Sequence, residues 1–198
     1  MINLIDFTKS KVRKKILQYF FTNPEKEDYL REIARKFDED PSNLLKEMTR
    51  LEKEKIFVSD MRGKQKYYKL NTSHPLYNEL KSIVFKTIGI RGELENIVNK
   101  DNSILSAFIY GSYAKNLQDS TSDVDILMVI DEKKFDENKL ISKIHKLESL
   151  LSREFNYIYY SDKELSKKIA GKDSFITNII NKSKIILKGQ ELIERIQP

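Results

Sequence analysis

Two aspartates, Asp123 and Asp125, stand two positions apart at the start of an apolar segment. If that segment is a strand, residues two apart point to the same face, so the two carboxylates lie side by side. Neighbouring ionised carboxylates repel each other, and a divalent cation such as Mg²⁺ or Mn²⁺ relieves the repulsion. Earlier in the chain, Gly111-Ser112 ends another apolar segment at a turn, where backbone N–H groups and a hydroxyl are available to phosphate oxygens. Together the two motifs predict a site for a metal ion and a phosphate group.

Runs of apolar residues, separated by polar loops and glycines, predict the elements that position these groups. The Gly-Ser turn and the aspartates lie at the ends of two buried strands, joined through a short helix-like stretch and a polar loop. A longer helix, another strand, two further helices and an edge strand that ends at Gly189 follow. In chain order the expected segments are 105–110 (strand), 113–117 (helix-like), 118–122 (loop), 126–130 (strand), 136–151 (helix), 155–160 (strand), 162–170 and 174–181 (helices) and 185–187 (edge strand).

The order Gly111-Ser112, Asp123-x-Asp125 and apolar strand resembles the nucleotidyltransferase fold of the DNA polymerase β superfamily. The motifs are closest to its minimal, MNT-like members, including those paired with HEPN toxins, and the resemblance covers roughly residues 93–190. It implies that Gly111 and Ser112 hold the triphosphate of an NTP and that Asp123 and Asp125 bind Mg²⁺ (or Mn²⁺). In that superfamily a nucleotidyl group is transferred to a hydroxyl and pyrophosphate is released.

The third carboxylate that such sites normally carry on a later strand is missing from its expected place. The resemblance puts Asn156 there, and an amide brings no charge and cannot accept a proton. Glu154, two residues earlier and on the same face of a strand, is the candidate substitute, so the predicted catalytic set is Asp123, Asp125 and Glu154. Whether the domain transfers nucleotides or only binds them is left open. The role of Lys115 is left open as well: it is either a phosphate contact or part of a solvated helix face.

All of the net positive charge lies in the first half of the chain. Residues 1–90 hold 19 Lys and Arg against 13 Asp and Glu, whereas residues 91–198 hold 17 of each kind. A basic half beside a neutral one favours a nucleic-acid-facing module joined to a second domain.

Three short helices and a hairpin are predicted in this basic half. The helices are expected over 12–21, over 29–37 and from Pro41 onward, because Asp40 suits the N-cap and Pro41 the first helical position. Gly63 supplies the positive φ that a tight hairpin needs. The third helix is expected to bury Leu44, Leu45, Met48 and Leu51, and the hairpin strands are expected at 56–58 and 66–70.

This order of elements resembles the ArsR-like winged-helix DNA-binding domain over residues 8–73. A recognition helix of this kind enters the major groove, where its side chains meet base edges, and wing cations meet phosphates. Winged helices also serve as protein–protein modules, which is the alternative. On double-stranded DNA the predicted groove residues are Ser42, Asn43, Lys46 and Arg50, and the predicted phosphate contacts are Arg62, Lys64 and Lys66.

A further amphipathic helix over 75–88 follows the hairpin. In ArsR-like domains the first and last helices form a dimer interface, so the resemblance implies a homodimer; packing against the second half is the alternative. Gly89 and Gly92 lie just beyond this helix and mark a boundary. The expected domains are therefore a winged-helix domain over 1–90 and a nucleotidyltransferase-like domain over 91–198.

The expected fold class is α+β, with an N-terminal winged helix-turn-helix followed by a small nucleotidyltransferase-type domain built on a mixed sheet. The favoured function is a DNA-binding regulator whose second domain binds NTP with Mg²⁺, with or without transfer of a nucleotidyl group to a hydroxyl. The alternatives are a transcription factor whose degenerate second domain senses nucleotide or binds a partner, and an antitoxin-like component with a separate toxin-like partner. The chain has no cysteine, and apolar runs such as 126–130 are too short to span a bilayer, so a cytoplasmic protein without membrane contact is expected.

Overall fold

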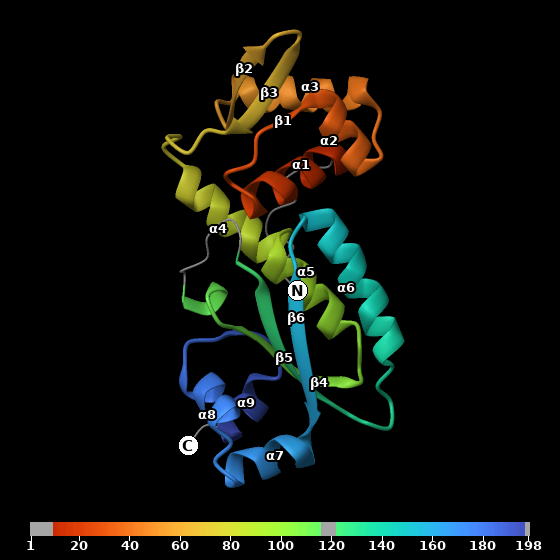
Figure 1. Cartoon of the computed structure of the whole chain (residues 1–198), viewed down its shortest axis with the longest axis vertical. Helices are drawn as coiled ribbons and strands as arrows, with labels where there is room; N and C mark the ends of the chain where they lie inside the picture. The colour runs from red at the N-terminus through yellow and green to blue at the C-terminus, as the bar shows by residue number, and fades with distance from the viewer. Residues whose placement is uncertain (1–9, 116–121, 197–198) are drawn as a thin grey trace. The chain divides into compact units, whose positions relative to one another are not determined.

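The computed structural model of the chain describes residues 10–115 and 122–196 (Figure 1). Contacts within the chain divide it into two compact units, residues 1–90 and residues 91–198. The loop predicted over 118–122 lies outside the described residues except for Ser122, and so do the last two positions of the stretch predicted over 113–117.

The described part of the first unit contains four helices and a small antiparallel sheet of strand order β1-β3-β2. The helices and the hairpin are those expected from the sequence, within a few residues at their ends. Strand β1 was not expected, because it forms only by pairing Asp28 and Tyr29 with Tyr68 and Tyr67, which are distant in sequence. In chain order the elements are α1 (Lys11–Thr22), β1 (Asp28–Tyr29), α2 (Leu30–Phe37), α3 (Pro41–Lys53), β2 (Phe57–Arg62), β3 (Gln65–Leu70) and α4 (Tyr77–Thr87).

Helix α3 begins as predicted, because the Asp40 carboxylate accepts hydrogen bonds from the first free backbone N–H groups of the helix. Its buried side rests on Leu44, Met48 and Leu51. The prediction that Leu45 is buried was wrong, since its side chain is 44% exposed. Each helical residue turns about 100° from the one before, which rotates Leu45 away from the buried side. Glu47 lies there instead, in an ion pair with Arg13 at 2.9 Å.

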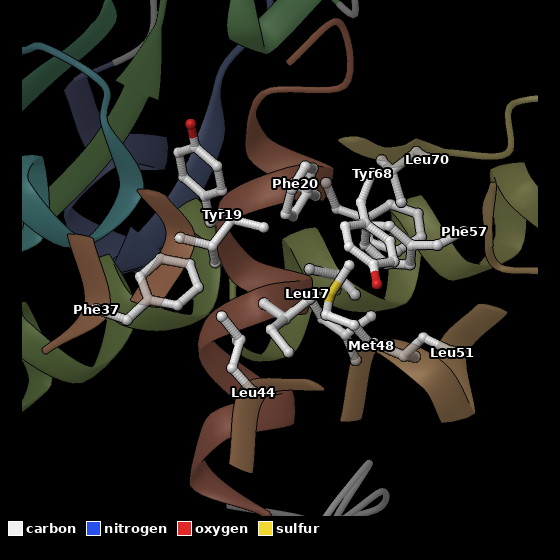
Figure 2. Packing of buried hydrophobic residues seen from close by; sticks show 14 of the residues in the cluster. Leu17, Tyr19, Phe20, Phe37, Leu44, Met48, Leu51, Phe57, Tyr68 and Leu70 are labelled. Carbon is white, nitrogen blue, oxygen red and sulfur yellow. The ribbon is translucent and has the colours of Figure 1, made fainter. Parts of the chain in front are cut away.

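An aromatic core joins α1 to the hairpin and to the other helices (Figure 2). The rings of Phe20 and Phe57 meet edge to face with centroids 4.9 Å apart, and those of Tyr19 and Phe37 do so at 5.6 Å. The buried hydroxyl of Tyr19 donates a hydrogen bond of 2.7 Å to Asp28, and burial together with that carboxylate raises the pKa of Tyr19. These contacts fix the positions of α3 and the hairpin relative to α1, because aromatic side chains bury large areas with few rotatable bonds.

Helix α4 packs against α1 within the first unit. The rings of Tyr77 and Phe21 stack at 5.9 Å, and Val84 is fully buried in the aromatic core. The Gln18 side chain donates a hydrogen bond to the carbonyl of Ile88, the residue that caps the C-terminus of α4. Part of the apolar stripe of α4 is therefore used inside the unit; the homodimer stays a prediction.

The second unit contains a four-stranded mixed sheet of order β6-β5-β4-β7, which confirms the expected mixed sheet. Strands β5 and β6 are parallel, and the other neighbours are antiparallel. The edge strand expected at 185–187 is present, and a final helix that the sequence reading missed follows it. The elements are α5 (Ile90–Asn99), β4 (Ile104–Tyr110), the 3₁₀ turn η1 (Tyr113–Lys115), β5 (Val124–Ile130), α6 (Glu137–Leu151), β6 (Phe155–Ser161), α7 (Asp162–Ala170), α8 (Ser174–Asn181), β7 (Ile185–Lys188) and α9 (Gln190–Ile196).

Helices α7, α8 and α9 cover one face of this sheet and lie together in Figure 1. Phe108, Leu127 and Val129 project from the sheet into this layer. Since side chains alternate along a strand, Asp125 projects to the same face as Leu127, at the beginning of β5. In the part of the chain that the structure describes, no helix is both long and apolar enough to cross a bilayer.

Candidate functional site

Strand pairing brings the Gly-Ser turn and the aspartates of the second unit together. The antiparallel pairing of β4 with β5 sets Tyr110 opposite Asp125, so the turn at Gly111 begins directly beside that aspartate. The parallel pairing of β5 with β6 sets Asn156 on the other side of Asp125. Paired residues on neighbouring strands project to the same face, so the groups converge at one end of the sheet.

Gly111 allows the turn to approach the Asp125 carboxylate closely. Its φ of +76° is in the left-handed region that favours glycine, and a Cβ added there would lie 2.3 Å from Asp125 Oδ2. A side chain at this position would therefore have to displace the carboxylate. Ser112 is half-buried directly after it, and its carbonyl accepts a hydrogen bond from the N–H of the exposed Lys115 at 3.2 Å. The turn thus presents backbone next to the aspartates, as a phosphate cradle requires.

Asn156 lies between the two aspartates. Its side-chain amide donates to Asp123 Oδ2 at 3.3 Å and to Asp125 Oδ1 at 3.5 Å. Both distances are long for N–H···O hydrogen bonds, so the amide neutralises the pair only weakly. The amide thus contacts both carboxylates at once.

The electrostatics of the pair follow from burial and from like charge. Burial and, to a smaller extent, the charge of Asp123 raise the pKa of Asp125, while the hydrogen bond from Asn156 opposes the rise. Burial and the Asp125 charge also raise the pKa of Tyr110 to about 12. The site therefore holds negative charge at a cost, which a bound cation would remove.

The donor set fits a hard divalent cation. Carboxylate and amide oxygens are the ligands that Mg²⁺ and Mn²⁺ take in proteins, and Asn156 can offer its oxygen after rotation of the amide. Gly111 approaches Asp125 closely, so the Gly-Ser turn lies directly beside these oxygens.

Glu154 is not gathered with the aspartate pair. Its side chain is exposed just before β6, and its backbone carbonyl accepts a hydrogen bond from Val124 at 3.0 Å. Across residues 10–115 and 122–196, no three His, Cys, Asp or Glu side chains form a group that could hold a metal ion. The structure therefore groups Asp123 and Asp125 with Asn156, and the role of Glu154 as a third acid stays a prediction.

Two residues near the site were missed by sequence reasoning. Tyr110 faces Asp125 across the β4–β5 pair, and its strand pattern alone gave no hint of that contact. Arg153 is buried, and its guanidinium donates to the carbonyl of Ser122 at 3.2 Å, which fixes the backbone just before Asp123. A lone arginine between a helix and a strand carries no sequence signal for such a role.

In the first unit, α3 presents the predicted groove residues on its exposed side. Ser42, Asn43, Lys46 and Arg50 are all exposed. Arg50 is partly committed, because its guanidinium lies 3.4 Å from the carboxylate of Glu47. The remaining three lie in the first two turns, which is the part of a recognition helix that meets base edges.

The predicted wing cations are compensated to different degrees. Arg62 pairs with Glu27 and with Asp60, and Lys66 pairs with Glu52 at 2.7 Å. These bonds raise the pKa of both cations, Arg62 chiefly through Glu27 and Lys66 chiefly through Glu52. Lys64 is exposed beside the hairpin glycine, Gly63 (φ +61°), and pairs with no carboxylate of the described residues.

Two family models match separate parts of the chain. Residues 91–186 match the family model of the nucleotidyltransferase domain, and residues 4–54 match the EarA-like family. The second unit is therefore of the nucleotidyltransferase type, and each match covers less than half of the chain. No curated protein matches the sequence.

Two solved structures are similar over about half of the chain. One is a toxin–antitoxin crystal structure with AMP-PNP, with 16% identity, a TM-score of 0.41, and coverage of 54% of this chain and 80% of that chain. The other is a mutant of the toxin–antitoxin MntA-HpeT, with 13% identity, a TM-score of 0.40, and coverage of 55% of this chain and 80% of that chain.

Proposed function

We propose that the protein is a DNA-binding regulator whose nucleotidyltransferase-type unit binds a nucleoside triphosphate together with Mg²⁺. The observation that carries the nucleotide half is the close approach of Gly111 to Asp125, with Asp123 and Asn156 beside it. It sets a backbone turn suited to phosphate against a carboxylate pair suited to a cation. A triphosphate complexed with a divalent metal needs both of these features at once.

Within this site each residue has a defined task. The N–H groups of the Gly111-Ser112 turn and the Ser112 hydroxyl bind phosphate oxygens, while Asp123 and Asp125 hold the cation. A cation held there would supply neutralisation of the phosphate charge. Asn156 keeps the two carboxylates together when no metal is bound and contributes no negative charge of its own. Binding without efficient transfer is what this composition supports best, because the described residues group no third carboxylate with the two aspartates that would hold the cation.

The DNA-binding half of the proposal is supported by the first unit. Three helices followed by a hairpin, with the short β1 added to its sheet, support the proposal of an ArsR-like winged helix. Asp40 caps an α3 whose first two turns are exposed and polar. Lys46 and Lys64 are exposed cations with no carboxylate within ion-pair distance among the described residues, and they provide the phosphate contacts on which affinity for a duplex depends.

Calorimetric titration tests the nucleotide site. ATP and GTP are titrated with and without Mg²⁺ into the full chain and into the variant Asp123→Asn/Asp125→Asn. We expect Mg²⁺-dependent binding in the native chain and none in the variant. A matched control, Glu132→Gln/Asp162→Asn, also removes two negative charges from exposed positions of the second unit and should bind as the native chain does. Nucleotide binding that is equal in all three proteins would contradict the site.

Transfer of a nucleotidyl group to a hydroxyl acceptor is the second candidate function. One observation of backbone register favours it: Val124 pairs with Phe155, so the backbone of Glu154 lies one step before that pair, beside Asp123, although its side chain is not grouped with the aspartates. A third carboxylate in that place would bind metal and accept the acceptor proton. Glu154→Gln should then abolish Mg²⁺-dependent release of pyrophosphate from NTP. Equal release by the native chain and Glu154→Gln would exclude this role.

A further inference from the structure

Helix α3 carries an apolar side chain on its exposed side, at the edge that borders the buried side. Leu45 is three residues after Ser42 and four before Thr49, so the three side chains are neighbours along the helix, and all are exposed, as is Lys46. Leu45 is the apolar member of this set and is 44% exposed, while Leu44, Met48 and Leu51 of the same helix are buried. Its side chain is therefore directed away from the core of the unit and lies between Ser42 and Thr49.

The neighbours of Leu45 restrict what this side of α3 can bind. Lys46 supplies positive charge, Ser42 and Thr49 are short hydroxyl residues, and Arg50 is drawn toward Glu47. A face with one apolar group surrounded by hydroxyls and a cation is poorly suited to an apolar protein surface. It suits the floor of a DNA major groove, which is negatively charged, polar and marked by isolated methyl groups.

A leucine has no donor or acceptor, so it can read only an apolar group of a base. Among the four base edges exposed in the major groove, the C5-methyl of thymine is that group. We propose that Leu45 contacts a thymine methyl and so requires a T·A pair at one position of the bound site. This inference rests on the proposed DNA binding and adds a residue that determines specificity.

Uracil substitution tests the proposal, because it removes the methyl and leaves the pairing edges of the base unchanged. Duplexes bound by the full chain are first selected from random sequences, and each thymine of the selected site is then replaced by deoxyuridine. At one position per half-site we expect binding to weaken about fourfold, the effect of losing one buried methyl group. In Leu45→Ala the thymine and uracil duplexes should bind equally well.

Leu76→Ala is the matched control, because Leu76 is also an exposed leucine of the first unit, at 55% exposure, and lies outside α3. This variant should keep the fourfold preference for thymine. If uracil weakens the native chain and Leu45→Ala by the same factor, or weakens neither, the role of Leu45 is wrong although DNA binding stands. If the native chain binds no duplex, the DNA-binding function itself fails.

Discussion

The two units treat charge in opposite ways. In the hairpin of the first unit, Arg62, Lys66 and Lys69 are each paired with a carboxylate, the partners being Glu27, Asp60 and Glu52. At the sheet end of the second unit, Asp123 and Asp125 stand side by side, and a neutral amide lies between them. The first cluster is balanced within the fold, whereas the second is left with like charges.

This difference separates structural charge from functional charge. Exposed ion pairs stabilise a fold by at most about 1 kcal/mol each and need no ligand to explain them. A partly buried pair of carboxylates destabilises the fold, so its presence supports the proposal of a cation bound from outside the chain. For the same reason, the paired hairpin cations are expected to contribute less to DNA affinity. A cation that is already paired with a carboxylate gains less binding free energy from a phosphate.

The largest effect is expected from Gly111→Ala, which would push the aspartate pair apart. The added Cβ would lie 2.3 Å from Asp125 Oδ2, and disturbing the groups that orient a metal ligand costs roughly 10- to 100-fold in metal affinity. We therefore expect calorimetry to show about a hundredfold loss of Mg²⁺-dependent ATP affinity. Gly63→Ala is the control, since Gly63 has a similar φ of +61° but no atom within 4 Å of the added Cβ. Full ATP affinity in Gly111→Ala would show that the turn is not part of the site.

Asn156→Asp should increase the uncompensated negative charge of the second unit's site, because it places a third carboxylate beside Asp123 and Asp125. The amide now donates to both aspartates, so a carboxylate in its place would repel them and lower the melting temperature without metal. In exchange, Mn²⁺ affinity should rise about tenfold, measured by titration without nucleotide. Asn156→Ala removes the amide without adding charge and should not gain affinity. A melting temperature and Mn²⁺ affinity unchanged in Asn156→Asp would mean that this residue does not contact the pair.

Local patterns predicted most elements of the fold. The N-cap at Asp40 and the strand periodicity around Gly111 and Asp125 depend on neighbouring residues, and the structure has each in place. Strand β1 could not be predicted, since two residues form a strand only against a partner about forty residues away. The burial of Leu45 was mispredicted for the opposite reason: an apolar residue next to a buried one was assigned to the core without regard to helix rotation.

In the candidate site, too, local motifs were predictable from the sequence, whereas contacts between distant residues were not. The motifs at Gly111 and Asp123 were visible as spacings along the chain. The resemblance placed Asn156 at the third-acid position, but its contacts with both aspartates depend on the parallel register of β5 and β6, which only the folded sheet sets. Arg62 pairs with Glu27 and Lys66 pairs with Glu52, which lie outside the hairpin, so the sequence did not reveal that these two predicted phosphate contacts are already paired within the fold.

The salt dependence of duplex binding tests whether the paired hairpin cations contribute less to DNA binding than the unpaired one. Lys64→Ala should reduce the slope of log affinity against log salt by about 1, as expected for one lost phosphate contact. Arg62→Ala and Lys66→Ala should reduce the slope less, because Glu27, Asp60 and Glu52 already compensate these cations. The measurement is a series of fluorescence-anisotropy titrations at increasing salt. Equal slopes for all three variants would show that intramolecular pairing does not decide which cation contacts DNA.

The smallest expected effect is the change in folding stability with pH, and the direction of that change follows from the pKa shift. The pKa of Asp125 is raised in the folded chain, chiefly by burial, so the folded state holds its proton more tightly than the unfolded state does. Its ionisation therefore removes stability as pH rises from the unfolded value of about 3.9 through the raised folded value. Without metal, Asp125→Asn should raise the melting temperature at pH 7 by about 2 °C, and the gain should vanish below about pH 4.

Asp101, in the same unit, is expected to change the folding stability with pH in the opposite direction. Hydrogen bonds, first from the Ser103 hydroxyl and also from its backbone and from Lys143, lower the pKa of Asp101 to about 2. Its charge stabilises the fold above the unfolded value, and that stability is lost as pH falls toward 2. Asp101→Asn should therefore lower the melting temperature at pH 7 and have less effect in acid, measured by thermal unfolding across pH. If both variants shift the melting temperature in the same direction at pH 7, Asp125 is compensated within the fold as Asp101 is, and the argument for an external cation fails.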